Sequence, residues 1–155
     1  MRPYPANSPQ ALARILALGM LIDGVADESE YQLIAQDTGL AALGIDGRRI
    51  DSVTREIYED LELGGSMTRT LDQRLTAGDL SRVLGEVSLP YLQQTVLRSI
   101  MRIVVANNEL SPGEARLLRE ALVHWTNDEG VGHHPLPANL PTRRAADHGA
   151  GQARA

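Results

Sequence analysis

Hydrophobic residues recur at helical spacing along most of the chain. A nearly uninterrupted apolar run covers 11–22, and a weaker apolar stripe runs along 90–106. Between them, Ile50, Val53 and Ile57 follow one another at intervals of three and four residues, which places them on one face of a helix. No segment of useful length alternates with the period of two that marks a β-strand. The pattern therefore predicts an all-α fold, a compact helical bundle.

Capping and turn residues divide this pattern into six or seven helices. Ser8 and Pro9 take the cap and first-turn positions of the first helix, and Gly39 ends the second. The first helix is apolar on nearly all sides, so we expect it to be buried at the centre. The predicted helices cover 9–22, 28–38, 48–63, one or two short segments within 68–87, 90–106 and 112–125.

The last predicted helix sets Leu118, Leu122 and Trp125 at helical spacing, with Leu117 and Ala121 beside them, so we expect an apolar stripe centred on the first three side chains. From residue 126 onward, Gly, Pro, Asn, Ala and Arg dominate and apolar periodicity stops. Such a composition buries too little apolar surface to fold, which predicts a disordered tail. The expected organisation is a leader (1–8), a helical domain (9–125) and a tail (126–155).

One helix-turn-helix phrase occurs twice, at 22–30 and 106–114, and each copy joins an apolar helix to an amphipathic one. Both copies have capping-box form, in which a cap side chain and a glutamate three residues later satisfy free N–H groups of the new helix. The two boxes are Asp27-x-x-Glu30 and Ser111-x-x-Glu114. We therefore expect two pseudo-repeats about a pseudo-two-fold axis, with their apolar helices in contact at the centre.

Composition then narrows the chemistry. The chain of 155 residues suits a single domain, and the absence of Phe with only one Trp predicts an aliphatic core. Cys and Lys are both absent, which excludes disulfides, thiolate zinc sites, cysteine nucleophiles and Schiff-base lysines. The net charge of −5 argues against nucleic acid or anionic lipid as a main partner, because both attract positive surfaces.

The first apolar run, 11–22, is too short to span a bilayer. It has the length of the apolar core of a signal peptide, but it corresponds to 95–106 deep inside the chain, which argues against cleavage. We therefore expect a cytoplasmic protein without direct insertion into a membrane.

Acidic side chains gather at the first turn, where Asp23, Asp27 and Glu30 lie close together in the sequence. Carboxylates are the ligands that Ca²⁺ and Mg²⁺ prefer. The spacing is not that of an EF-hand, whose loop is longer and carries ligands at positions that are missing here. The alternative is that Asp27 and Glu30 only cap the helix while Asp23 is solvated. The residues alone leave both interpretations open.

Two other classes of function fit the residues poorly. A helix-turn-helix that reads DNA needs a basic recognition helix, whereas 28–37 carries acidic residues and no Arg. The residues give little support for a catalytic site, because His124 lies near a helix end and the other His residues fall in the tail. We therefore expect a non-enzymatic protein that does not bind nucleic acid.

An apolar helix that ends in Asp23-Gly24, with an acidic residue four positions on and a glutamate seven on, resembles the TerB-like tellurite-resistance family. A varied second copy lies in the C-terminal half, and the resemblance covers 9–125. It implies a helical bundle of two pseudo-repeats, no established catalytic activity, divalent-cation binding and service in bacterial metal or stress responses. Related domains are fused to J-domain co-chaperones, which implies a protein partner, including a membrane-associated one.

By position, the resemblance assigns Asp23, Asp27 and Glu30 to the acidic positions of the first copy and Glu114 to the glutamate of the second. This chain departs from the pattern at Asn107-Asn108 and Ser111, which removes two formal charges. Amide oxygens still ligate cations. The candidate ligands for Ca²⁺ or Mg²⁺ are Asp23, Asp27, Glu30, Asn107, Glu109 and Glu114.

The expected function is that of a TerB-like binding module whose acidic inter-helix turns act on a divalent cation or a partner protein. The alternative is a purely structural interaction or scaffold domain, in which the acids only cap helices and keep the protein soluble. The two hypotheses differ in one geometric respect, namely whether the acids of the two turns converge.

Overall fold

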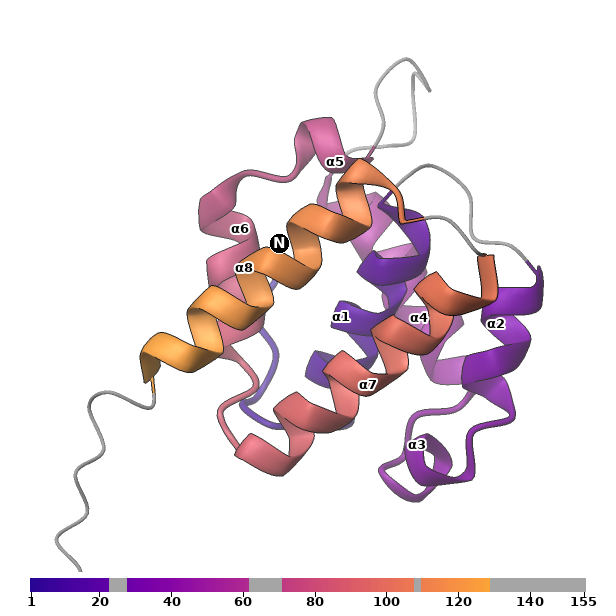
Figure 1. Cartoon of the computed structure of the whole chain (residues 1–155). Coiled ribbons are helices and arrows are strands. Elements are labelled where there is room, and N and C mark those ends of the chain that lie inside the picture. Colours follow the sequence, from indigo (N-terminus) through magenta and orange to yellow (C-terminus); the bar gives the residue numbers. More distant parts are fainter. Residues whose placement is uncertain (23–27, 62–70, 108–109, 129–155) are drawn as a thin grey trace, which may run out of the picture.

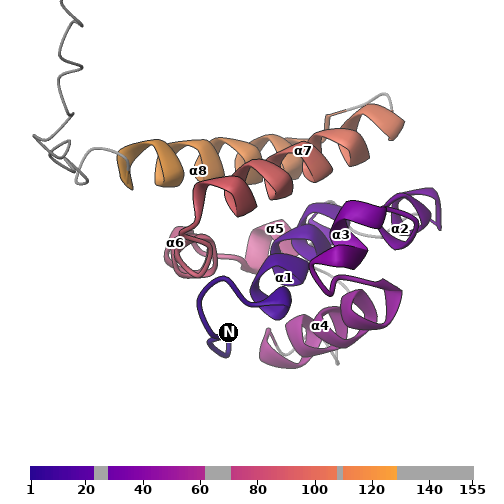
Figure 2. The ribbon, with the colours of Figure 1, turned by 90° about the horizontal axis from the view of Figure 1, so that it is seen from below.

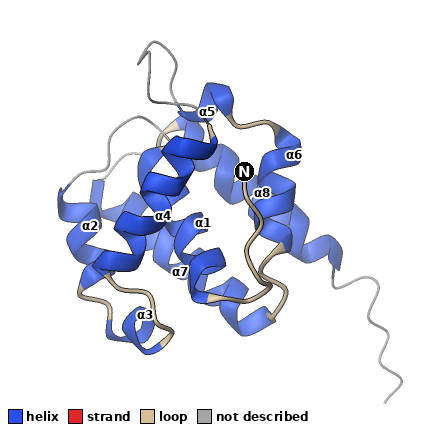
Figure 3. Ribbon diagram, turned by 180° about the vertical axis from the view of Figure 1, so that it is seen from behind, coloured by secondary structure: helices blue, strands red, loops and turns tan. Residues whose placement is uncertain are grey.

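The computed structural model describes residues 1–22, 28–61, 71–107 and 110–128, and it gives the backbone alone at 106–107 and 127–128. Every regular element in these segments is a helix (Figures 1 and 3), which confirms the predicted all-α fold. The helices are α1 (Pro9–Leu21), α2 (Glu28–Ala35), α3 (Thr38–Ala42), α4 (Gly47–Asp60), α5 (Leu71–Arg74), α6 (Ala77–Gly85), α7 (Pro90–Asn107) and α8 (Pro112–Asp128).

Helix α1 is the centre of the bundle. In Figure 2, α7 and α8 form one outer layer, α1 lies beneath them between α2 and α6, and α4 covers the opposite side. Helix α1 packs directly against α4, α6 and α7. Every residue from Ala11 to Ile22 is buried, as the apolar sequence predicts, and the Ser8 Oγ accepts a hydrogen bond from the Ala11 N–H (3.2 Å) to cap its first turn.

The two apolar helices of the pseudo-repeats are in contact, as predicted. A Cβ atom added to Gly19 of α1 would lie 3.6 Å from Ile100 Cγ1 of α7, an ordinary van der Waals distance. The pairing is also crosswise, because α2 packs on α7 while the start of α8 packs on the end of α1. Gly113 permits the latter approach, since a Cβ there would lie only 3.1 Å from Ile22 Cγ2. Each hairpin thus rests on the other hairpin's first helix.

Helix α8 buries a different stripe from the one expected. Leu117, Ala121 and Trp125 are buried, whereas Leu118 is half-buried and Leu122 is 50% exposed. Both stripes have helical spacing and share the tryptophan, so packing decides between them. Helix α8 packs against α6, and the Trp125 Nε1–H donates a hydrogen bond to the Leu84 carbonyl (3.2 Å) at the end of that helix. This contact sets the rotation of α8.

The segment 28–38, predicted as one helix, holds the end of α2 and the start of α3. The Asp37 Oδ1 accepts hydrogen bonds from the N–H groups of Gly39 (2.8 Å) and Leu40 (3.0 Å), which makes Asp37 the N-cap of a new helix. Gly39 therefore lies in the first turn of α3 and does not terminate α2. The prediction was wrong because a glycine is ambiguous between the two positions.

Other predicted boundaries differ by a few residues. Helix α4 begins one residue earlier than expected, with Asp46 as its cap, and α8 continues three residues further, to Asp128. The predicted disordered tail lies outside the described residues from 129 onward. None of the helices in the described part of the chain has the length and hydropathy needed to cross a membrane.

Candidate functional site

The acidic turns are described only in part. Glu30 on α2 and Glu114 on α8 are both buried, with 3% and 2% of their surface exposed. Asn107 is the last residue of α7, but its side chain lies outside the described residues, as do Asp23, Asp27 and Glu109. Two of the six candidate ligands can therefore be placed with their side chains.

Glu114 forms the capping box predicted from the sequence. Its N–H donates to the Ser111 Oγ (3.1 Å), and its carboxylate Oε2 accepts from the Ser111 N–H (2.8 Å). Helix α8 begins at Pro112, the first-turn position that proline favours. In the second pseudo-repeat, the glutamate thus has a structural role as the partner of its own N-cap.

The neighbourhoods of the two turns meet in space. Ile22, the last described residue before the first turn, contacts Gly113 at the start of the helix that follows the second turn. The Ile22 carbonyl also accepts a hydrogen bond from the Asp72 N–H (3.3 Å) of α5. Among the residues that the structure describes, no three His, Asp or Glu side chains form a group able to hold a metal ion. The side chains of the other four candidate ligands lie outside the described residues, so cation binding by the two turns stays a prediction.

A second candidate site is the solvent face of α7 and α8, which sequence reasoning did not identify. Tyr91, Met101 and Val105 recur along one side of α7, and Leu122 and Val123 lie on α8. These five side chains are 47–66% exposed. Such clusters of exposed large apolar side chains are typical of interaction surfaces. The signal was present in the sequence, since both helices are apolar on more than one side.

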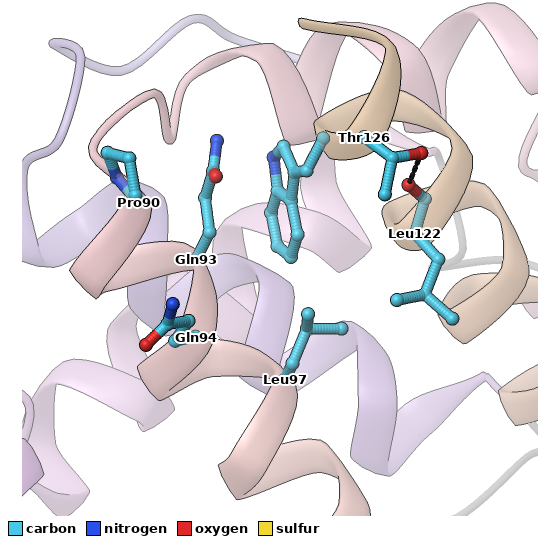
Figure 4. A pocket seen from close by; sticks show the side chains of 7 residues that line it. Pro90, Gln93, Gln94, Leu97, Leu122 and Thr126 are labelled. Atoms are coloured by element: carbon cyan, nitrogen blue, oxygen red, sulfur yellow. Dashed lines mark hydrogen bonds between the residues drawn. The ribbon is translucent and has the colours of Figure 1, made fainter. Parts of the chain in front are cut away.

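A pocket of about 120 Å³ lies between the two helices, and one of the five exposed apolar side chains, Leu122, lines it. Figure 4 shows its α7 wall and, opposite, Leu122 and Thr126 of α8. Gln94 and Leu122 line the pocket and are also exposed, so the exposed faces of α7 and α8 meet there. The lining residues are Pro90, Gln93, Gln94, Leu97, Leu122, Trp125 and Thr126. We call this pocket and the five exposed apolar side chains the α7/α8 face.

The charge of α7 is positive, in contrast to that of the whole chain. Helix α7 contains Arg98 and Arg102 and no acidic residue, while the net charge of the protein is −5. Arg98 is exposed and forms no ion pair with any described residue. Arg119 on α8 is also exposed and lies 3.6 Å from its neighbour Glu120. Arg102 pairs with Asp37 of the α2–α3 connection, so Arg98 is the guanidinium of α7 without an ion pair among the described residues.

Residues 1–7, which belong to the predicted leader (1–8), pack on the helical body and complete a polar network. Arg14 of α1 is 2% exposed, and its guanidinium pairs with the Glu86 carboxylate after α6. The same guanidinium lies 4.2 Å from the centroid of the Tyr4 ring and donates to the Arg2 carbonyl (2.5 Å). Tyr4 in turn donates its hydroxyl hydrogen to Glu56 of α4. A buried charge is stable only with such partners.

Hydrogen bonds and burial shift the pKa values of three groups beside this network, namely Arg2, Asp60 and Tyr4. Hydrogen bonds to Asp60 and Glu59 raise the pKa of the Arg2 guanidinium. Burial raises the pKa of Asp60, but the hydrogen bonds from Arg2 outweigh it and hold this pKa below its ordinary value of 3.8. Burial and the hydrogen bond to Glu56 raise the pKa of Tyr4, which stays a hydrogen-bond donor.

The sequence contained one signal of this network, namely an arginine inside an apolar helix. Its partners could not be identified, because Glu86 is 72 residues away and Glu56 lies 52 residues from Tyr4. No protein-family profile, curated protein or solved structure matches this chain. The resemblance to the TerB-like family therefore stays a prediction.

Proposed function

We propose that this protein is a non-enzymatic binding module that engages a partner protein through the α7/α8 face. The observation that carries the proposal is the pocket at the junction of the two helices, with the half-exposed Leu122 in its lining. Exposing such side chains to water is unfavourable, and covering them with a partner releases that free energy. The pocket offers room for one apolar anchor side chain.

The partner that fits this face is an amphipathic helix with an apolar stripe and acidic flanks. The apolar stripe would cover Met101, Val105 and Leu122, while an acid would pair with Arg98. The charge on the face supports this choice, because α7 is basic and without acidic residues. A basic partner would meet like charge and bind less well.

Cation binding by the acidic turns is a second candidate function. It is favoured by the burial of Glu30 and Glu114, which occupy equivalent positions in the two pseudo-repeats. Carboxylate oxygens are the ligands that divalent cations such as Ca²⁺ and Mg²⁺ prefer. The capping bonds between Ser111 and Glu114 favour the structural role instead. We therefore place this candidate behind protein binding.

The test uses synthetic helical peptides and the fluorescence of Trp125, the only tryptophan of the chain, which lines the pocket. An amphipathic peptide with leucine anchors and glutamate flanks is titrated beside the same peptide with lysine flanks. We expect a saturable change in Trp125 emission with the acidic peptide and a much weaker one with the basic peptide. Arg98→Glu should weaken binding of the acidic peptide about tenfold.

Leu122→Ala probes the apolar contact and should also weaken binding about tenfold if this side chain is a central contact. The matched control is Tyr58→Ala, because Tyr58 is an exposed apolar side chain on α4, on the other side of the bundle. Equal binding of the acidic and basic peptides, or equal effects of Leu122→Ala and Tyr58→Ala, would contradict the proposal.

A further inference from the structure

We propose that the groove beside α1, between α4 and the end of α6, is a peptide-binding site, and that residues 1–7 occupy it as an internal ligand. The external ligand that fits is an extended peptide with an arginine two residues before a tyrosine. This site is separate from the α7/α8 face, and Figure 2 shows the N-terminal segment on the side away from α7. The inference does not depend on the proposed function.

The first anchor of the segment is Arg2. Its N–H and Nε donate to the two carboxylate oxygens of Asp60 (2.7 and 2.8 Å), and its guanidinium also pairs with Glu59 (2.8 Å) and Glu56 (3.5 Å). Three carboxylates of α4 thus surround one guanidinium. Planar, multiple donation of this kind is the usual way in which a protein recognises arginine.

The second anchor is Tyr4. The aromatic ring lies over the Arg14 guanidinium, and the hydroxyl donates to Glu56. The Tyr4 N–H donates to the other carboxylate oxygen of Glu86 (3.0 Å), the one that Arg14 does not use. The site therefore contacts the ring, the hydroxyl group and the backbone of a single residue.

The third anchor is Asn7, where the segment turns into α1. The backbone N–H donates to the Glu86 carbonyl (2.7 Å), and the side-chain Oδ1 accepts from the N–H groups of Ser88 (2.9 Å) and Leu89 (3.1 Å). The residue has a φ of 59°, in the left-handed region that asparagine tolerates. The turn closes the segment onto the groove.

The segment is held as a peptide ligand is, through side chains distant in the sequence, although Met1 and Tyr4 also pack against the edge of the core. Apart from Arg14, the side chains that hold it come from residues 52 or more positions away, and Pro3 and Pro5 are exposed. Such a proline-rich stretch is pre-organised in an extended form, which lowers the entropy lost on binding. Arg14 Nε has no hydrogen-bond partner in the described part of the chain, so the site holds one buried donor that residues 1–7 leave unused.

The outer end of the segment is the part that can be displaced. Arg2 is 40% exposed and Glu59 is 55% exposed, so water solvates both groups when they separate. A tethered ligand, however, competes at an effective concentration of about millimolar. An external peptide therefore binds only when the contacts of the internal segment are weakened. Residues 1–7 thus determine the concentration that an external peptide needs to occupy the site.

The test measures binding of a fluorescent peptide with the sequence of residues 1–7 to the full-length chain by fluorescence anisotropy. The double variant Arg2→Ala/Tyr4→Ala loses both anchors but keeps the walls of the groove. We expect this variant to bind the peptide at least about tenfold more tightly than the wild type does. A peptide with both anchors replaced by alanine should not bind, and adding Glu56→Gln to the variant should weaken binding.

Circular dichroism first shows whether the double variant is folded. If it is not, Arg2→Ala alone serves, since this change frees only the outer end of the segment, and a smaller gain in peptide affinity is expected. The proposal is overturned if the folded variant binds the peptide no better than the wild type, or if the alanine-substituted peptide binds equally well.

Discussion

Arg14 is a buried charge that several neighbouring groups compensate. It is the only charged residue of α1 and is almost fully buried, so its charge needs compensation inside the bundle. Glu86 supplies the opposite charge, while the Arg2 carbonyl and the Tyr4 ring supply further contacts. One arginine thereby fixes the place of the N-terminal segment relative to α6.

Replacing Glu86 with alanine should therefore destabilise the protein strongly. The change leaves the Arg14 guanidinium buried without a carboxylate, and removing one partner of a buried pair costs about 3–5 kcal/mol. Urea denaturation followed by circular dichroism measures the free energy of unfolding. The control is Glu120→Ala, which removes a partly exposed partner of Arg119 and should cost below about 1 kcal/mol. Similar losses of unfolding free energy in both variants would show that the buried pair contributes no more to stability than the exposed pair does.

Asp23 and Asp27 decide between cation binding and helix capping. Asparagine caps a helix about as well as aspartate, so Asp27→Asn should leave metal-free stability nearly unchanged, whereas Asp27→Ala should cost roughly 0.5–2 kcal/mol. If the turn binds a cation, Asp23→Asn and Asp27→Asn should each weaken the binding of that cation, because each change removes a formal charge. Calorimetric titration of Ca²⁺ and Mg²⁺ measures this. Absence of heat in the wild type at millimolar ion, or identical isotherms in all three proteins, would reject cation binding.

At the scale of the helix, α8 shows why a periodic pattern leaves its rotation open. The sequence offers two apolar stripes that share Trp125, and the hydrogen bond from its indole to Leu84 favours the stripe with Leu117. That hydrogen bond joins residues 41 positions apart, so it cannot be predicted from the spacing of apolar residues. The existence of the helix was predictable and its buried face was not.

Leu117→Ala should accordingly be the damaging substitution in α8. Leu117 is 1% exposed and contacts the surface of α1 at Gly19, so its loss leaves a cavity that costs about 2–5 kcal/mol. Leu122→Ala should change the free energy of unfolding by only about 0.5 kcal/mol, because half of this side chain is already in water. Thermal and urea unfolding of both variants compare them. A larger loss in Leu122→Ala would contradict the observed rotation of the helix.

Helix α6 carries a capping box whose strength depends on pH. The Thr76 hydroxyl donates to Asp79 (2.6 Å), and this hydrogen bond, which outweighs desolvation, lowers the pKa of Asp79 below its ordinary value of 3.8. A group with a lowered pKa in the folded state stabilises the protein above its unfolded pKa, and this contribution is lost as the pH falls through the folded pKa.

The stability difference between the wild type and Asp79→Asn should therefore shrink as the pH is lowered from about 5 to about 2. Melting temperatures measured across this range by circular dichroism give the difference directly. Asp60 titrates in the same range, but it is present in both proteins and so cancels in the comparison. A difference that stays constant with pH would show that the Asp79 carboxylate does not act through its charge.

At the scale of the whole molecule, the sequence predicted what depends on local spacing. The apolar character of 11–22 identified the central helix, and the repeated turn identified the two helices that meet there. Neither the place of Tyr4 nor the pocket beside Trp125 could be predicted, because each depends on contacts between segments that are far apart in the chain. Long-range packing, rather than any weakness of the helical pattern, limited the prediction of the candidate sites.

Removal of residues 129–155 should leave the stability of the helical body almost unchanged. Their composition offers little apolar surface to bury, and the cut falls after the last residue of α8, so it keeps Thr126 and its hydrogen bond to the Leu122 carbonyl (2.7 Å). Circular dichroism melts of the full chain and the truncated chain measure the effect. A markedly lower melting temperature of the truncated chain would show that the tail contacts the body.

The crosswise packing of the two hairpins has a consequence for the order of events during protein synthesis. When α1 leaves the ribosome, α4 soon follows. The side of α1 at Gly19 and Ile22, however, stays uncovered until Ile100 and Gly113 have been synthesised. Tyr4 and Asn7 likewise form their hydrogen bonds to Glu86 only after that residue has been synthesised. Contacts so distant along the chain form slowly, and the unfinished intermediate exposes apolar surface. The nascent chain therefore needs protection from aggregation until its second half has been made.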